Sequence, residues 1–311
     1  MNIQTSQKGA VTTITIDRQP NTENEIQLFF TSDIHFDSVY CNRDLFFADL
    51  EEAKRREAMI CVFGDFFDAL NGRFDPRRDM SLLRPEYRRA DYYDYVVQDA
   101  SERLSPYAKN IMIITPGNHE LSVLKNANTF LSDRLVTKLN EKYSGNVLHG
   151  GYGGWLRVIL RSKGLPAGST LVKYFHGSGG EAPVTRGVIQ TNRQSVYLPD
   201  ADIVVNGHSH NGYWVPITRE RIGGKGDHFF DTQHHVRTPG YMQSYGDGTT
   251  GWEVTRGGVP KPLGSCFVKI KYANQDKFHH RPIISIEPII HNPIAISPVM
   301  DMFQGMIFPQ E

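Results

Sequence analysis

Three short runs of almost entirely apolar residues constrain the fold of this chain more than any other feature. They are "IQLFF" (26–30), "MICVF" (59–63) and "IMIIT" (111–115). A strand without polar alternation is buried on both faces, as are the central strands of a parallel sheet covered by helices. Apolar residues at helical spacing follow the first and third runs: Phe46, Leu50 and Ala53, then Leu131, Leu135 and Leu139. The pattern predicts an α/β layered fold.

The sequence changes character after residue 150. Strand-like runs dominate there, and helical periodicity is hard to find; the runs are "WLRVIL", "STLVKYFHG", "ADIVVNGHSH", "CFVKIKY" and "PIISIEPII". We therefore expect an α/β fold class with two mixed β-sheets packed face to face and helices on the outside, a four-layer αββα sandwich. The 311 residues suit a single domain, residues 1–311, with a motif core at 26–212, an insertion at 71–90 and C-terminal strands and a tail at 213–311.

Composition narrows the functional classes. With 34 basic and 34 acidic side chains the formal net charge is zero, so no global field attracts nucleic acid or an anionic membrane. The apolar runs are far shorter than a bilayer span, and the N-terminal segment lacks a basic start followed by an apolar block. Three scattered cysteines, Cys41, Cys61 and Cys266, are too few for a disulfide framework or a thiolate metal site. We expect a soluble, cytoplasmic protein without a membrane partner.

Potential metal ligands stand where the strands of this pattern end. They are Asp33 and His35 in "SDIHFD", Asp65 in "GDFFDAL", Asn118 and His119 in "PGNHE", His176 in "FHGSGG", and His208 and His210 in "VVNGHSHNGY". One such residue alone is more often a surface group or a turn, but five segments agree. Carboxylate, imidazole and amide ligands without thiolate suit manganese, iron or zinc. Residues at the carboxyl ends of strands build the sites of α/β folds, so these segments predict a metal centre.

The ordered blocks D-x-H, G-D-x-x-D, G-N-H-[DE], H and G-H-x-H resemble the calcineurin-like metallophosphoesterase superfamily, and the resemblance runs from Asp33 to His210. It implies two divalent cations, with manganese expected first and iron or zinc as alternatives. By position in the blocks, one cation would be held by Asp33, His35, Asp65 and His210. The other would be held by Asp65, Asn118, His176 and His208, with Asp65 as the bridge.

The resemblance also implies roles beside the substrate. His119 would act as the general acid that protonates the leaving oxygen, and Glu120, which stands where many members have aspartate, would orient it. A hydroxide that bridges the two cations would attack the phosphorus in line with the leaving group. We interpret Asp68 as a residue that supports a ligand or fixes the loop, and not as a ligand itself.

Two expectations concern the histidines. In an extended strand His208 and His210 would share one face, so their assignment to different cations predicts that the backbone leaves strand geometry by Gly207. Four histidines fall outside the motif blocks and are expected to be structural: His234, His235, His279 and His280.

Departures from the family pattern bear on the substrate. Ala69 and Pro116 stand where the protein serine/threonine phosphatases carry arginines, so the chain is more similar to the phosphodiesterase, nuclease and small-nucleotide branch. Net neutrality favours a phosphodiesterase whose phosphoester substrate is a small molecule or a nucleotide. The alternative is a DNA or RNA nuclease, in which the arginines of 71–90 and the aromatic residues between Tyr213 and Trp252 would contact the strand; a solvated loop and plain packing are the other reading of these segments. A binding scaffold without catalysis is a third reading, and the oligomeric state is left open.

Overall fold

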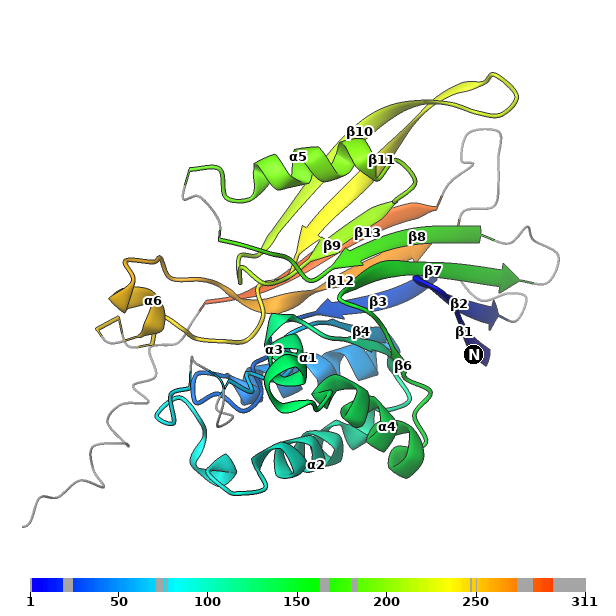
Figure 1. Cartoon of the computed structure of the whole chain (residues 1–311). Coiled ribbons are helices and arrows are strands. Elements are labelled where there is room, and N and C mark those ends of the chain that lie inside the picture. The colour runs from blue at the N-terminus through cyan, green and yellow to red at the C-terminus, as the bar shows by residue number, and fades with distance from the viewer. Residues whose placement is uncertain are drawn as a thin grey trace, which may run out of the picture.

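The structure, a computed structural model, shows two β-sheets face to face with helices on the outer side of each (Figure 1). This arrangement confirms the predicted four-layer αββα sandwich. The described residues are 2–18, 25–70, 75, 78–162, 168–180, 184–246, 248–249, 251–272 and 282–292.

The six-stranded sheet carries the three apolar runs at its centre. Its order is β13 (Ile283–His291), β12 (Leu263–Lys271), β3 (Glu25–Thr31), β4 (Met59–Phe63), β5 (Ile111–Thr115) and β6 (Leu148–His149). Strands β3 to β6 are parallel neighbours, whereas β12 is antiparallel to both β3 and β13. Every residue of β4 and β5 is buried, as expected for strands covered on both faces. The carboxyl ends of these parallel strands therefore lie along one edge.

The seven-stranded sheet is also mixed. Its order is β1 (Asn2–Lys8), β2 (Val11–Arg18), β7 (Gly153–Ser162), β8 (Gly168–Phe175), β9 (Ile203–Asn206), β11 (His228–Arg237) and β10 (Tyr213–Ile222). The pairs β2–β7, β8–β9 and β9–β11 are parallel, and the pairs β1–β2, β7–β8 and β10–β11 are antiparallel. Strands β8 and β9 thus deliver the residues that follow them to the same end of this sheet.

Two apolar layers hold the sandwich together. Between the sheets, side chains such as Phe30, Phe63 and Tyr174 are buried in one cluster. A second cluster, including Phe46 and Leu135, lies between the six-stranded sheet and its covering helices. These helices are α1 (Arg43–Arg55), α2 (Tyr92–Leu104), α3 (Asn118–Ala127) and α4 (Leu131–Tyr143), with the short 3-10 helices η1 (Pro85–Tyr87) and η2 (Ser105–Tyr107) (Figure 1). The predicted helices after the first and third runs are confirmed as α1 and α4.

After residue 150 the described part of the chain forms two helices that the sequence pattern does not indicate. Helix α5 (Val188–Tyr197) covers the outer face of the seven-stranded sheet (Figure 1), and α6 (Trp252–Thr255) is a single turn. The residues that α5 buries are polar, Thr191 and Gln194, while apolar side chains such as Val196 are exposed, so no apolar period marks the helix in the sequence. None of the helices in the described part of the chain is long and apolar enough to cross a membrane.

Candidate metal centre

Candidate ligands from both sheets meet where their strands end. Asp33 and His35 follow β3, Asp65 follows β4, and Asn118 opens α3 shortly after β5. The seven-stranded sheet supplies His176 after β8, and His208 and His210 after β9. The structure thus brings together the seven residues that the sequence analysis selected as ligands: Asp33, His35, Asp65, Asn118, His176, His208 and His210.

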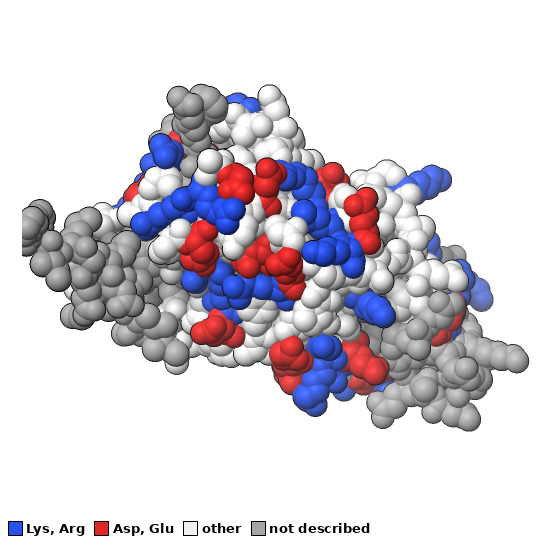
Figure 2. Space-filling view, turned by 90° about the horizontal axis from the view of Figure 1, so that it is seen from below, with Lys and Arg blue, Asp and Glu red and all other residues white. Residues whose placement is uncertain are grey.

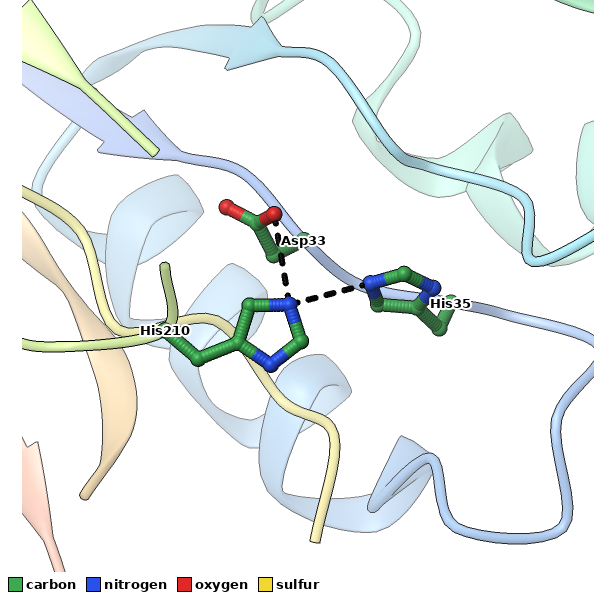
Figure 3. Close-up of side chains that lie close together, drawn as sticks. All are labelled: Asp33, His35 and His210. Atoms are coloured by element: carbon green, nitrogen blue, oxygen red, sulfur yellow. Dashed lines mark hydrogen bonds and ion pairs between the residues drawn. The ribbon is translucent and has the colours of Figure 1, made fainter. Parts of the chain in front are cut away.

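Asp33, His35 and His210 form the first group of potential ligands (Figure 3). Nε2 of His210 lies 3.4 Å from Oδ1 of Asp33 and 3.2 Å from Nε2 of His35. Ligands that each lie about 2.0–2.2 Å from one cation are roughly 3 to 3.5 Å from one another. The spacing of these atoms therefore suits a single divalent cation.

Asp65, His176 and His208 form the second group, whose ligand atoms lie within 4.8 Å of one another. Nε2 of His176 is 3.1 Å from Oδ2 of Asp65 and 3.2 Å from Oδ1 of Asn118. The same nitrogen is 3.9 Å from Oδ1 of Asp33, so the two groups are neighbours. Both groups present nitrogen and oxygen atoms, a donor set that fits divalent transition metals.

Two of the imidazoles are oriented by contacts on their far side. Nδ1 of His35 donates to Oδ1 of Asp68 at 3.0 Å, and Nδ1 of His176 donates to the backbone carbonyl of Phe63 at 2.9 Å. A hydrogen bond of this kind fixes the tautomer, so that the other ring nitrogen carries the lone pair. In both rings that other nitrogen is the Nε2 atom that faces the neighbouring ligands.

The carboxylates at the centre are buried and charged. Burial alone would raise the pKa of Asp33 and of Asp65, but His176 and His210 bring the pKa of Asp33 to about 2, and His176 and His119 hold that of Asp65 well below its usual range. Conversely, burial would lower the pKa of His176, yet the two carboxylates raise it to about 9. Two adjacent carboxylates away from water need positive charge, which bound cations would supply.

Five of the seven candidate ligands have a left-handed backbone. The φ angles are 52° at Asp33, 51° at His35, 50° at Asp65, 72° at His208 and 56° at His210. A residue with a side chain adopts this conformation rarely, at a cost of about 1–3 kcal/mol, and such residues cluster at functional sites. Strand β9 ends before these last two histidines, which confirms that the backbone has left strand geometry by residue 207. The pair then diverges into different groups.

Two glycines allow the segments to approach closely. A Cβ atom on Gly64 would lie 2.4 Å from Nδ1 of His176, and one on Gly117 would lie 2.0 Å from Oδ1 of Asp65. Both distances are shorter than any real contact, so a side chain at either position would push a candidate ligand out of place.

His119 lies at the border of the ligand cluster, with Nε2 3.8 Å from Oδ2 of Asp65. Its Nδ1 donates to the backbone carbonyl of Asp68 at 2.6 Å and is 3.4 Å from the carboxylate of that residue. Burial would lower the pKa of His119, but the charges of Asp65 and Asp68 raise it to about 10. The contact at Nδ1 thus fixes the ring with Nε2 facing the cluster. Because His119 also forms a group of ligand spacing with His35 and Asp65, its role stays a prediction.

The carboxylate of Glu120 is directed at the backbone and not at the ring of His119. Its Oε2 accepts from the amides of Gly117 at 2.8 Å and Asp65 at 3.2 Å, and its Oε1 accepts from the amide of Phe67 at 2.9 Å. Consecutive residues of a helix point in different directions, which separates Glu120 from His119. Asp68, and not Glu120, makes the contact that orients the ring of His119. Glu120 instead connects the loop after β4 to the loop after β5.

Glu120→Ala is expected to destabilise the protein by about 3 kcal/mol or more, because three buried amides lose their acceptor and each unsatisfied group costs about 1–3 kcal/mol. Urea denaturation of the variant and the wild type would measure the difference. The control is Glu141→Ala, which removes an exposed glutamate from α4 and should change stability by less than about 0.5 kcal/mol. Equal stability of the two variants would contradict this account of Glu120.

The structural role expected of the histidines outside the motif blocks stays a prediction, and of these four His234 and His235 lie on β11. His234 accepts at Nδ1 from Nε1 of Trp214 at 3.1 Å, and Nε2 of His235 lies 2.9 Å from the side-chain oxygen of Gln233. His279 and His280 lie outside the described residues, as does the tail from residue 293.

Two basic residues that no sequence motif indicates, Arg237 and Lys261, lie beside the loop that carries His208 and His210. Nη1 of Arg237 donates to Oγ of Ser209 at 3.0 Å, and Nζ of Lys261 donates to the backbone carbonyl of Ser209 at 2.9 Å. Neither belongs to a motif. The pairing of Arg237 with Asn206 across β11 and β9 places it there, and that register could not be derived from the local pattern.

Comparison with known proteins relates the chain to one family. The family model described as calcineurin-like phosphoesterase matches residues 26–212, which is more than half of the chain. No curated protein matches the chain.

Several solved structures are similar to this chain, but with low TM-scores and low sequence identities. They include Vps29 of Chaetomium thermophilum (10% identity, 86% of this chain and 97% of that chain, TM-score 0.32) and GAP50 of the Plasmodium inner membrane complex (11%, 86% and 85%, TM-score 0.38). A phosphatase from Mycoplasma pneumoniae is similar at 11% identity, over 87% of this chain and 95% of that chain, with a TM-score of 0.36. The family assignment therefore depends on the family model.

Proposed function

Because the chain belongs to the calcineurin-like phosphoesterase family, for which metal-dependent phosphoester hydrolysis is the implied reaction, we propose that it is a phosphodiesterase with two divalent cations and a small-molecule or nucleotide substrate. The observation that carries this proposal is the convergence of buried carboxylates and imidazoles from both sheets in two adjacent groups.

The proposed ligand sets follow these groups. Asp33, His35 and His210 would hold one cation, and His176, His208 and Asn118 the other, with Asp65 shared between the sets because its carboxylate borders both. When bound, two such cations, of which manganese is our first choice, supply an activated water molecule as nucleophile and neutralise charge on the phosphate.

The residues of the chain supply orientation and a proton. Asp68 contacts both rings: its carboxylate accepts from Nδ1 of His35, and its backbone carbonyl accepts from Nδ1 of His119. His119 directs Nε2 toward the cluster, 3.8 Å from Oδ2 of Asp65, and as an imidazolium it would donate the proton on Nε2 to the departing oxygen of the ester. Buried surroundings limit the access of bulk water to this proton.

Charge on one face of the molecule gives no support to a polynucleotide substrate. On the face formed by α1, α2 and α4, the basic and acidic side chains of the described residues are interspersed (Figure 2). Within the insertion, Arg84 donates to the backbone carbonyls of Ser38 and Cys41, and Arg88 donates to that of Leu83. Arg84 thus ties the insertion to the loop after β3, and Arg88 contacts a carbonyl within the insertion, so in this part of the segment these two arginines have structural contacts.

The function is tested with protein stripped by a chelator and reloaded with manganese, iron or zinc. We expect about two metal ions per chain, activity restored by manganese, faster hydrolysis of bis-(p-nitrophenyl) phosphate than of p-nitrophenyl phosphate, and a weak dependence on salt. Cyclic nucleotides and single-stranded DNA complete the substrate set. Steeply salt-dependent cleavage of DNA would favour the nuclease. Fewer than two ions per chain without hydrolysis of any ester would favour the binding scaffold.

A further inference from the structure

A small pocket that is open to solvent lies beside His208. The glycine-rich segment 177–180 forms one wall, the loop after β9 another, and Gln190 and Gln194 of α5 a third. Among the described residues that line the pocket, Arg237 is the one with a permanent charge, and none is acidic. The lining therefore carries one positive charge without an acidic partner, and the pocket shares His208 with the candidate metal centre.

Arg237 is held in place before any ligand binds. Its side chain comes from the last residue of β11 and is buried, with 6% of the residue exposed. Nη1 donates to Oγ of Ser209, and the guanidinium lies 4.9 Å from the centre of the Tyr213 ring. A guanidinium fixed in this way loses little conformational entropy when it binds an anion, and its planar fork matches a phosphate or a carboxylate.

The glycine-rich wall leaves room for a ligand on the opposite side. Gly177 has a φ of 131°, and a Cβ atom there would lie 2.6 Å from Cβ of His208, so the absence of a side chain lets this wall lie against the metal centre. At Gly179 and Gly180 an added Cβ would meet nothing within 4 Å. The wall thus lies against His208 at one end and is open at the other.

We propose that Arg237 and this pocket bind a second anionic group of the substrate, a phosphate or a carboxylate, while the scissile phosphate lies at the adjacent metal centre. The inference rests on the proposed function and narrows its substrate class to phosphodiesters that carry a further negative charge. In this role Arg237 determines specificity: it contacts the part of the substrate that does not react.

The test compares three diesters with the same leaving group: ethyl p-nitrophenyl phosphate and its analogues with a 2-carboxyethyl or a 2-phosphoethyl group in place of ethyl. The manganese-loaded wild type should hydrolyse at least one anionic analogue with a lower KM than the ethyl ester, and the better analogue identifies the anion. In Arg237→Met this preference should disappear through a rise in KM of about tenfold to a hundredfold for that analogue. The rise in KM should be larger for the anionic analogue than for the ethyl ester, which lacks the second anion.

Ser209→Ala separates anion binding from positioning of the loop, because it removes the hydrogen bond to Arg237 but keeps the guanidinium; the preference for the anionic analogue should persist in this variant, with a smaller rise in KM than in Arg237→Met. If Arg237 served only to position the loop of His208, both variants would lose activity alike on all three esters and lose metal. That result would overturn the inference, as would a wild type without preference for an anion. If the wild type hydrolysed none of the three esters, the proposed function itself would be contradicted. Melting temperature and metal content of each variant show whether it is folded.

Discussion

Asp65→Asn is expected to lose cations from both ligand groups and with them nearly all hydrolysis. The Asp65 carboxylate is 3.1 Å from Nε2 of His176, and it also forms a group of ligand spacing with His35 and His119. Removing a residue that only supports a ligand costs tenfold to a hundredfold in metal affinity, so loss of this central carboxylate should exceed about a hundredfold. Metal analysis after dialysis, together with kcat/KM on bis-(p-nitrophenyl) phosphate, measures both effects.

Asp49→Asn is the matched control for this substitution. Asp49 is also a buried aspartate, but it accepts from the hydroxyl of Tyr241 and contacts Nε2 of His291 instead of the centre. Its variant should keep the metal content and activity of the wild type. Normal double occupancy in Asp65→Asn would remove the shared position assigned to Asp65. Loss of metal in both variants would show that the effect comes from general destabilisation.

His119→Ala should keep both cations and lower kcat by about a hundredfold to ten-thousandfold, the usual contribution of a general acid. The loss should be largest for esters with a poor leaving group. p-Nitrophenolate can depart without a proton, whereas phenolate depends more strongly on protonation as it leaves. Comparing diphenyl phosphate with bis-(p-nitrophenyl) phosphate separates these cases. The structural basis is the position of Nε2 beside the cluster, together with the charges of Asp65 and Asp68, which raise the pKa of His119.

Asp68→Asn provides the companion measurement. It weakens the contacts to both His119 and His35, so we expect a smaller loss of kcat than in His119→Ala and a tenfold to hundredfold loss of metal affinity. If His119→Ala itself lost a cation, or if its defect were the same for both leaving groups, His119 would belong with the ligands.

The central part of the fold and the neighbourhood of the candidate ligands could be predicted because both depend on local patterns. The runs 59–63 and 111–115 have no polar alternation, and a buried parallel sheet is the arrangement that tolerates this. Once these strands are parallel, residues such as Asp65 and Asn118 that follow them must lie at one edge. Their position is therefore a consequence of the pattern, whatever their chemical role.

Other features depend on relations that the local pattern does not contain. The direction of Glu120 depends on the rotation of α3 relative to β4, and the position of Arg237 depends on the register between β9 and β11. Helix α5 shows no apolar helical period in the sequence, because the residues that it buries, Thr191 and Gln194, are polar. In each case tertiary contacts, and not local propensity, determine the structure.

The origin of the candidate ligands in both sheets links metal affinity to the cohesion of the whole sandwich. Cations at the centre would tie the ends of β3 and β4 to those of β8 and β9 across the apolar layer. At a free-ion concentration a hundred times the dissociation constant, such binding adds about 2.7 kcal/mol to the folded state. By the same linkage, weakening the contact between the sheets that the Tyr174 and Phe63 rings make at 5.2 Å should raise the free-ion concentration needed to keep the chain folded. A substitution in the apolar layer, whose side chain binds no ion, can thus change how much metal the folded state requires.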